Sequence, residues 1–459
     1  MLNTFIYWLT QKRWLVFAIM VGIIMYNISA PAGLSIEGYR TLIIVVMAII
    51  LIIFEPIPLP AVAMMILIMQ VLLGIDTPNG VAKSFMSDAV FFIMGSLMLA
   101  VAIISQGLDS RLALGIIKLT GNKTWKIVIG FIAISAFLSS FIGEHTVTAM
   151  MMPVGLTLIK NSGVDNRSTA KLAALILFSI AYGSAMGSIG TPSGGGRNVI
   201  MLGYMKEFGV VNISYLQWMK YAYPILLLEI PLAAIILWYT FKPRQLILDS
   251  AVRKLKIHVT KRGSMSGNEI LTILIFVFVF LGWVFFSSKV GLGIIALIGV
   301  FLYLAFGLIR WEDLNRNTNW GVIILFGAAV SLGLHMKDTG AAFWVADTAI
   351  NWMKMISDDV SIIRWFVAVV LTGLLTNLLS NAATVAVIGP IVLNMGGDTL
   401  VMGFSTAIAS AFAYLTVVAS PTCMIIHSSG LIDKSDYLRA GWKMFIMSVL
   451  VLFIISNFW

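Results

Sequence analysis

The sequence predicts an all-α polytopic membrane protein, with about eleven transmembrane helices in two inverted repeats that each contain a re-entrant hairpin and a broken helix. Composition is the first evidence, because 60% of the 459 residues are apolar, 11% are charged and the mean hydropathy is +0.99. A soluble globular chain carries about 25% charged residues. The other evidence is a series of apolar runs of membrane-spanning length and a matching order of motifs in the two halves.

The same composition excludes several other classes of protein. The single cysteine, Cys423, has no intrachain partner, so a disulfide scaffold is excluded. The net charge of +10 comes mostly from Lys and Arg in short loops between apolar runs, which indicates topogenic charge rather than a nucleic-acid-binding face. We find no spacing typical of a nucleophile–base pair or a zinc site, so the sequence does not favour an enzyme, and we expect no cofactor.

Eleven apolar runs are long enough, alone or with an interruption, to cross about 30 Å of hydrocarbon. They cover residues 14–30, 41–54, 62–75, 85–105, 171–201, 221–239, 270–286, 291–309, 320–335, 399–426 and 442–458, of which 171–201 and 399–426 are interrupted. The first run also resembles a cleaved signal peptide, but the ten further crossings favour an anchored first helix. Within the fifth crossing, the small residues of the GSAMG run at 183–187 predict close helix packing.

Two more apolar segments, residues 125–159 and 365–393, have polar centres that a simple crossing does not tolerate. The first centre holds Ser139, Ser140, Gly143, Glu144 and His145, and the second holds Asn377, Ser380 and Asn381. Irregular backbone at membrane depth requires surrounding protein or a water-filled cavity. We therefore predict that each segment is a re-entrant hairpin, in which two half-helices meet at a polar tip.

Alternate crossings from a cytoplasmic N-terminus place most of the Lys and Arg residues on the cytoplasmic side, as the positive-inside rule requires. The C-terminus then lies outside. The cytoplasmic segments include one sizeable basic loop at residues 242–262, which divides the chain into two halves. We expect an integral protein of a bacterial inner membrane with this orientation, which contacts the lipid bilayer and has no nucleic acid as a partner.

The two halves carry the same motifs in the same order. Pro153 lies ten residues after Gly143, and Pro390 lies ten residues after Ser380. Each hairpin is followed by a broken crossing, centred on Thr191-Pro192 in the first half and on Ser420-Pro421 in the second. In the predicted topology the first hairpin enters from the cytoplasm and the second from outside. Inverted repeats whose discontinuous helices meet at the midplane are typical of secondary transporters.

Three motifs resemble those of the divalent anion/sodium symporter (DASS) family. Residues 55–61 read EPIPLPA and resemble its Glu-Ala-Ile-Pro-Leu-Pro-Val segment. Residues 380–384 read SNAAT and resemble its second Ser-Asn-Thr hairpin motif. Residues 190–198 read GTPSGGGRN and take the place of its Gly-Thr-x-x-Gly-Thr-Pro-Pro-Asn stretch. The likeness covers nearly the whole chain in order and spacing.

The resemblance implies a homodimer in which each protomer has a fixed scaffold and a transport domain that carries substrate by an elevator movement. It implies a division into scaffold helices (1–124), first hairpin with the fifth and sixth crossings (125–240), basic cytoplasmic linker (241–268), second-half scaffold helices (269–360), and second hairpin with the last two crossings (361–459). In this family the hairpin tips and broken crossings bind a di- or tricarboxylate or sulfate between two sodium ions.

The resemblance also implies which residues form the site. Substrate binding is expected at Glu144, His145, Thr146, Arg197, Asn198, Ser380, Asn381, Ser420 and Thr422. A second-half Na⁺ site is expected at Thr376, Asn377, Ser380, Asn381 and Ala419. Amide and hydroxyl oxygens at this tip suit a hard cation. The first tip departs from the family, because Gly143, Glu144 and His145 stand where its Ser-Asn-Thr motif would be.

The charged residues of the first half-site leave several roles open. An ionised side chain at bilayer depth costs about 2.5–3.5 kcal/mol on insertion scales, so Glu144 and Arg197 should be paired, hydrated or used. Glu144 can be a proton or cation ligand, Arg197 can clamp an anionic substrate, or the two can form a structural ion pair in place of Na⁺. His145 titrates near neutral pH, so Glu144 and His145 are candidates for proton coupling.

We therefore expect a secondary transporter of a small divalent anion, a di- or tricarboxylate, sulfate or sulfonate, that is coupled to Na⁺ or H⁺ or runs as an exchanger. Two alternatives stay open: a Na⁺/H⁺ antiporter or arsenite-type transporter with the same fold, and a channel or non-transporting receptor. Glu229, between Pro224 and Pro231, is a further carboxylate at membrane depth, for which we expect a structural or kink role.

Overall fold

The computed structural model describes residues 12–108, 111, 120–162, 166–209, 213–243, 246–260, 264–355, 357–417 and 419–459, and for 166–169 and 255–260 it describes the backbone alone. Parts of the predicted basic linker at 241–268, and parts of the predicted cytoplasmic loop before the first hairpin, lie outside these residues. The described elements are helices, and they form an all-α membrane protein of two inverted repeats.

The first half runs from α2 to α12. Its helices are α2 (Arg13–Tyr26), α3 (Ile36–Phe54), α4 (Leu59–Leu72), α5 (Pro78–Phe85), α6 (Asp88–Ser105), α8 (Thr124–Ile142), α9 (Glu144–Lys160), α10 (Asn166–Gly187), the 3₁₀-helix η1 (Pro192–Gly194), α11 (Gly196–Glu207) and α12 (Tyr215–Phe241). Helix α13 (Asp249–Thr260) follows in the linker between the halves.

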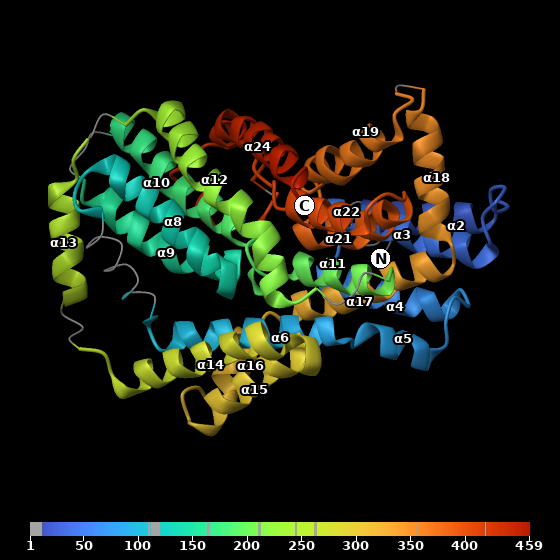
Figure 1. Cartoon of the computed structure of the whole chain (residues 1–459), viewed down its shortest axis with the longest axis horizontal. Helices are drawn as coiled ribbons and strands as arrows, with labels where there is room; N and C mark the ends of the chain where they lie inside the picture. The colour runs from blue at the N-terminus through green and yellow to red at the C-terminus, as the bar shows by residue number, and fades with distance from the viewer. Residues whose placement is uncertain are drawn as a thin grey trace, which may run out of the picture.

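The second half runs from α14 to α24. Its helices are α14 (Gly267–Val290), α15 (Leu292–Ala305), α16 (Trp311–Asn317), α17 (Trp320–Asp338), α18 (Ala341–Met353), α19 (Val360–Trp365), the π-helix η2 (Phe366–Leu371), α20 (Thr372–Leu375), α21 (Asn381–Asn394), α22 (Thr399–Ala409), α23 (Pro421–His427) and α24 (Lys434–Ser456). Figure 1 shows α6, α14, α15 and α16 along one edge, with α11, α21 and α22 at the centre.

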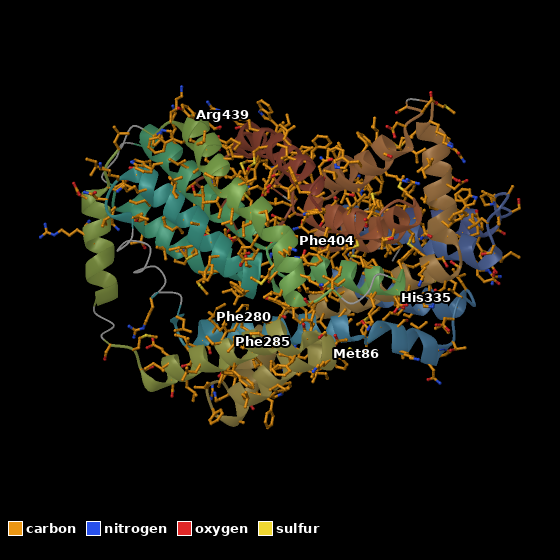
Figure 2. The ribbon with its side chains drawn as sticks, viewed as in Figure 1. Met86, Phe280, Phe285, His335, Phe404 and Arg439 are labelled. Carbon is orange, nitrogen blue, oxygen red and sulfur yellow. The ribbon has the colours of Figure 1, made fainter. Side chains whose placement is uncertain are left out.

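Within the described residues, eight helices are long and apolar enough to cross a membrane: α3, α6, α8, α10, α12, α14, α17 and α24. The predicted crossings in α2, α4 and α15 are helices of 14 residues. At 1.5 Å per residue, such a helix spans about 21 Å, which is less than the hydrocarbon thickness. The apolar faces that α14 and α24 expose fit a lipid environment, as Phe285 shows at 66% exposure (Figure 2).

Several boundaries differ from those predicted. The crossing predicted at 85–105 is α6, which begins three residues later at Asp88 because residue 85 is the last residue of the separate short helix α5. Helix α24 begins eight residues before the predicted 442, because Asp433 and Asp436 form a capping box that starts the helix there. Helix α18 was not predicted at all, since its 13 residues mix polar and apolar side chains without a long apolar run.

The packing repeats between the halves with the partners exchanged. Helix α4 packs on α17 of the other half, and α15, its counterpart, packs on α6. Likewise α3 packs on α4 as α14 packs on α15, and α10 packs on α8 as α22 packs on η2. Helices α12 and α24, which end the two halves, pack on one another. This exchange is what an internal two-fold relation between inverted repeats produces.

Side-chain hydrogen bonds join helix ends that the predicted topology places on the same side of the membrane. Among the ends predicted to be cytoplasmic, they join Lys12 to Pro56, Gln106 to Leu308 and Asn122 to Asp249. Among the ends predicted to lie outside, they join Ser35 to Thr339, Arg40 to Leu73 and Asp88 to Leu292. The assignment of these ends to the cytoplasm and to the outside stays a prediction.

The small residues of α10 allow it to approach α8 closely. A Cβ atom at Gly187 would lie 2.1 Å from the Ala136 carbonyl oxygen, and one at Gly183 would lie 2.7 Å from the Ile132 carbonyl oxygen. Real Cβ atoms do not come so near, so any larger residue would push the two helices apart. The close packing predicted for residues 183–187 is therefore present, and it fixes the first hairpin against the broken helix.

Candidate functional site

The first hairpin tip is a single-residue link between two helices. Helix α8 ends at Ile142 and α9 begins at Glu144, and the intervening Gly143 has a φ of +84°, a conformation that favours glycine. Glu144 is the first residue of α9 and is 3% exposed. A carboxylate at a helix N-terminus faces the positive end of the helix dipole, which favours its charge.

The broken crossing of the first half brings an arginine to the same place. Helix α10 ends at Gly187, the chain turns through η1, and α11 begins at Gly196, so that Arg197 and Asn198 lie in the first turn of α11. The Asn198 side-chain amide donates to the Ser188 and Thr191 carbonyl oxygens, each at 2.8 Å, and so holds the turn. Its own Oδ1 atom is buried and has no hydrogen-bond partner within the described residues.

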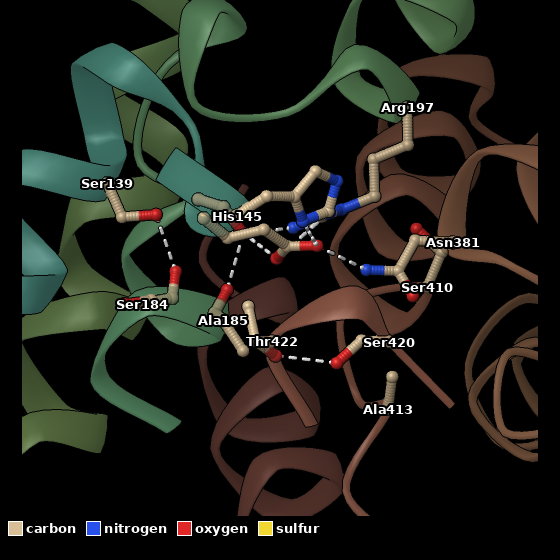
Figure 3. A network of polar contacts seen from close by, with 12 residues as sticks. Ser139, His145, Ser184, Ala185, Arg197, Asn381, Ser410, Ala413, Ser420 and Thr422 are labelled. Atoms are coloured by element: carbon tan, nitrogen blue, oxygen red, sulfur yellow. Dashed lines mark hydrogen bonds and ion pairs between the residues drawn. The ribbon is translucent and has the colours of Figure 1, made fainter. Parts of the chain in front are cut away.

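Glu144 is the centre of a buried polar network that links the two halves (Figure 3). Its Oε2 atom lies 3.5 Å from a guanidinium nitrogen of Arg197 and accepts a hydrogen bond from the Ser188 hydroxyl at 2.8 Å. The Ser188 hydroxyl in turn accepts from Arg197. The other carboxylate oxygen, Oε1, accepts from the Asn381 side-chain amide of the second hairpin at 2.9 Å. The two tips therefore touch, and the predicted Glu144–Arg197 ion pair is present.

The residues after Glu144 are more accessible. The side chain of His145 is 47% exposed, and its Nδ1 atom lies 3.7 Å from Glu144 Oε1. Thr146, one residue further along α9, is partly buried. Figure 3 shows His145 and Arg197 side by side above the tip of the second hairpin. His145 is thus placed to exchange protons with water while it remains close to the carboxylate.

The second hairpin tip gathers three oxygen atoms. Ser380 caps α21 through its side chain, and Asn381 follows as the first residue of that helix. The Thr376 hydroxyl lies 2.9 Å from Asn381 Oδ1 and 2.7 Å from the carbonyl oxygen of Ser410, the residue that directly follows α22. Thr376 is fully buried and Asn381 is 6% exposed. Hydroxyl, amide and carbonyl oxygens are the ligand types that a hard cation such as Na⁺ prefers.

Asn377 holds the loop between α22 and α23 instead of pointing at this cluster. Its amide nitrogen donates to the Gly373 and Phe412 carbonyl oxygens, and its Oδ1 atom accepts from the Leu415 N–H at 2.7 Å. The Thr416 hydroxyl donates to the Asn377 carbonyl oxygen at 3.0 Å. The amide of Asn377 is thus fully engaged with backbone groups.

The first half repeats this loop contact. The Ser140 hydroxyl donates to the Gly187 carbonyl oxygen at 2.8 Å, and the Ser140 carbonyl oxygen accepts from the Thr191 hydroxyl. Ser140 therefore stands where Asn377 stands in the second half, and Thr191 stands where Thr416 does. The two half-sites have the same backbone plan, and they differ at the tip, where Glu144 takes the position of the neutral Asn381.

The remaining predicted residues line the break in the second half. The Ser420 and Thr422 hydroxyls lie 2.6 Å apart, and Ser420 caps α23. Both side chains are buried, as is Ala419. The structure thus brings all the predicted site residues to the two tips and the two breaks. Two participants were missed, namely Ser188 and the Ser410 carbonyl group. Both immediately follow the last residue of a broken helix, and that position is the sequence signal that could have identified them.

A cavity of about 490 Å³ lies away from the tips. It opens between the end of α11, the start of α6 and the turn from α14 to α15, and its charged residues are Asp88, Lys206, Glu207 and Lys289. The predicted topology places these helix ends on the side of the membrane opposite Lys12 and Asn122.

Comparisons with known proteins agree with this architecture. A family profile described as "Sodium:sulfate symporter transmembrane region" matches residues 9–459. An uncharacterized transporter of Haemophilus influenzae is 25% identical over 456 residues, which cover 95% of this chain and 93% of the relative. The sodium-dependent dicarboxylate transporter SdcS of Staphylococcus saprophyticus is 26% identical, with 93% of this chain and 87% of the relative covered.

The similarity extends to an animal protein and to a solved structure. The sodium-dependent high-affinity dicarboxylate transporter 3 of Caenorhabditis elegans is 25% identical, with 84% of this chain and 77% of the relative covered. The crystal structure of the YdaH transporter of Alcanivorax borkumensis superposes with a TM-score of 0.52 at 11% identity, and covers 83% of this chain and 87% of that chain. At 11% identity, this superposition supports a similar fold and nothing further.

Proposed function

Because the chain belongs to the sodium:sulfate symporter family of membrane transporters, we propose that it carries a small divalent anion across the membrane with Na⁺ as the coupling ion. The protein is thus a transporter and not an enzyme. Among divalent anions, dicarboxylates are the first candidates, since two of the similar proteins are named as sodium-dependent dicarboxylate transporters. Tricarboxylates, sulfate and sulfonates also present anionic oxygens to hydrogen-bond donors and are the next candidates.

The observation that carries this proposal is the meeting of the two hairpin tips. The N-termini of α9, α11 and α21 converge there, and the contacts of Glu144 with Arg197 and with Asn381 join them. Helix N-termini present unpaired N–H groups and partial positive charge, which favour an anion between them. Exposed His145 and the side-chain amide of Asn381 add polar groups that can donate hydrogen bonds to a carboxylate.

We propose one Na⁺ site, in the second half. Its proposed ligands are Thr376 Oγ1, Asn381 Oδ1 and the Ser410 carbonyl oxygen. Ser380 precedes Asn381 in the chain, and Ala419 lies in the loop that follows Ser410. In the first half, the Arg197 guanidinium supplies a fixed positive charge in the equivalent place, with Glu144 as its counter-ion. Arg197 retains an Nε atom without a partner among the described residues, which leaves one donor for a substrate carboxylate.

The transport movement proposed is that of an elevator. In this proposal, the moving transport domain contains α8–α12 and α19–α24. The fixed scaffold contains α2–α6 and α14–α18, and it forms a dimer with the scaffold of a second copy. Tyr204 of α11 lies at the boundary: its hydroxyl is 3.1 Å from the Ala329 carbonyl oxygen of α17 and 3.3 Å from the Ala386 carbonyl oxygen of α21. Such a contact holds one position of the transport domain and must break when the domain moves.

Transport by purified protein in liposomes tests the proposal. Labelled succinate and labelled sulfate are offered with an inward Na⁺ gradient, or with choline in its place. We expect uptake that requires Na⁺, and a Thr376→Val variant should need about tenfold more Na⁺, which corresponds to about 1.4 kcal/mol for one lost ligand. Thr372→Val is the matched control, because its hydroxyl bonds the Val367 carbonyl oxygen within the same arm and lies outside the oxygen cluster.

Two other results would replace this proposal. Anion movement that ignores Na⁺ and requires internal anion would identify an exchanger, which the Glu144–Arg197 pair favours because a fixed positive charge needs no driving ion. Absence of anion movement, together with Na⁺-driven proton efflux, would identify a Na⁺/H⁺ antiporter with Glu144 as its exchanging carboxylate. The N-terminus of the protein is proposed to lie in the cytoplasm of a bacterial cell, which labelling of residues on each face from either side of the membrane would test.

A further inference from the structure

A second carboxyl group is buried away from the tips. Glu229 lies at the middle of α12, between Pro224 and Pro231, and is fully buried. Neither of its carboxyl oxygens has a hydrogen-bond partner in the part of the chain that the structure describes. The kink role expected for Glu229 does not explain this environment, because the two prolines already interrupt the helix and a carboxyl group contributes nothing to such a bend.

Two hydroxyl groups face Glu229, and both are buried and also lack partners among the described residues. Ser448 of α24 lies beside Glu229, and it lies beside Tyr414 as well. Tyr414 belongs to the loop between α22 and α23, so it comes from the break in the second half. Three polar side chains from α12, α24 and this loop therefore face one another in a fully buried place, without the hydrogen bonds that buried polar groups ordinarily make.

No positive charge acts on Glu229 itself among the described residues, whereas Arg197 and Glu144 of the first tip lie within electrostatic reach of Tyr414. Helix α12 packs on α8, α10, α14 and α24. The charged residues of these helices lie near their ends: Lys126 on α8, Arg167 and Lys171 on α10, Glu269 and Lys289 on α14, and Lys434, Asp436, Arg439 and Lys443 on α24. On α12 itself, Lys220 lies more than two turns away. The titratable group that faces Glu229 from the loop is Tyr414.

An ionised carboxylate in such a place is expensive, since burial of a charge without a partner costs several kcal/mol, whereas a protonated carboxyl can be buried as a neutral donor. We propose that Glu229 is a proton-binding site of the transport cycle, separate from the hairpin tips and connected to them through Ser448 and Tyr414. A hydronium ion gives its proton to the carboxylate, which forms the neutral carboxyl group and a water molecule, and the reverse step returns the proton to water. A hydroxyl group can accept one hydrogen bond while it donates another, so the two hydroxyls are able to pass a proton in sequence.

The loop around Tyr414 connects this proton to the ion site. The residue after Tyr414 is Leu415, whose N–H holds the Asn377 amide at 2.7 Å. The Tyr414 carbonyl oxygen accepts from the Tyr182 hydroxyl at 3.3 Å, and a Cβ atom added to Gly441 of α24 would lie 2.2 Å from it. This tight packing means that a charge appearing on Glu229 acts directly on the loop that supports the second tip. Loss of the proton should therefore loosen the loop and admit water.

The inference rests on the proposed transport function and is tested in the same liposomes. A gradient of one pH unit supplies about 1.4 kcal/mol per proton, which corresponds to about a tenfold change in accumulation. With Na⁺ equal on both sides, an inward proton gradient should raise anion accumulation in the unmodified protein by this factor and leave Glu229→Gln without a response. Both proteins meet the same substrate, so protonation of the anion itself cannot cause the difference. Glu312→Gln, on exposed α16, is the matched control and should respond like the unmodified protein.

Two results would overturn the inference: a proton gradient that drives Glu229→Gln as well as the unmodified protein, or one that drives neither while Na⁺ drives both. If no anion moves under any condition, the proposed function fails and the proton site is judged from stability alone. A carboxyl that holds its proton in the folded protein but releases it on unfolding makes the folded state less stable as pH rises above about 4. The unfolding midpoint of the unmodified protein should then fall with rising pH more steeply than that of Glu229→Gln, and equal slopes would reject the site.

Discussion

Removal of the Arg197 charge should leave the Glu144 carboxylate buried without a counter-charge. The guanidinium and Glu144 are 3.5 Å apart, and their side chains are 3% and 4% exposed. Removal of one partner of a buried ion pair costs about 3–5 kcal/mol, because the other charge stays without compensation. In Arg197→Gln, Glu144 retains the neutral donors Ser188 and Asn381, which cannot replace a full positive charge. We expect a loss of stability within that range, and a similar loss in Glu144→Gln.

The double variant should be more stable than the sum of the two single losses predicts. With both charges gone, no uncompensated charge remains, so the coupling free energy should reach about 3 kcal/mol, at the upper end for residues in contact. Equilibrium unfolding in mixed detergent and SDS micelles measures the four proteins. Arg364→Gln is the control, because its guanidinium bonds the Met395 carbonyl oxygen at 2.8 Å and no ion pair of Arg364 is found among the described residues.

Losses that add to within about 0.5 kcal/mol would refute this reasoning, since independent sites behave in that way. Transport by the same proteins separates the two roles of Arg197. If the pair is structural, the double variant regains the KM for the anion that the single variants lose. If Arg197 clamps the substrate, KM stays high in the double variant although its stability recovers.

Three further predictions concern other parts of the fold. Gly187→Ala should prevent folding or lower stability by several kcal/mol, because its Cβ would lie 2.1 Å from a backbone oxygen of α8. Gly203→Ala is the control and should be tolerated, because nothing lies within 4 Å of its Cβ position. Fluorescence-detected size exclusion compares the two variants. Tyr204→Phe should change the rate of anion uptake without changing Na⁺ affinity, because it removes a boundary contact with α17 and leaves the tips intact; equal rates would exclude Tyr204 from the movement. The pKa of the Asp76 carboxyl lies below its ordinary value, because hydrogen bonds from His335 and a backbone N–H outweigh the effect of its slight burial. Its stabilising contribution should therefore be complete above about pH 4 and disappear as pH falls through the lowered pKa, so thermal midpoints across this range should fall less in Asp76→Asn.

The membrane class, the two hairpins and the two breaks could be predicted from the sequence because each rests on local chemistry. Long apolar runs bury themselves in hydrocarbon, and polar residues at the centre of such a run force the backbone to turn back or break. The equal spacing from Gly143 to Pro153 and from Ser380 to Pro390 marked the repeat, and both prolines lie inside the second arm of their hairpin as expected.

The ends of the elements were harder to predict because a few capping bonds decide them. Hydropathy placed the start of the last crossing near 442, whereas the capping box at Asp433 extends α24 into polar sequence. The start of α6 at Asp88 likewise has no trace in hydropathy, since the apolar run was predicted to begin at residue 85. It follows from the chain turning at residues 86 and 87 before Asp88 receives the N–H groups of Leu292 and Gly293 from the other half.

The sequence by itself determined that charged and amide side chains would stand at membrane depth, since their cost there required pairing or use. Only the tertiary structure decided the partners. Glu144 meets Arg197 through the break in α10 and α11, and meets Asn381 from 237 residues away, which local pattern cannot specify. The same holds for Glu229: only when the helices around α12 are in place is it visible that no counter-charge faces it within the described part of the chain. Contacts between distant segments depend on the packing of the whole chain, and residue order alone does not encode it in a readable form.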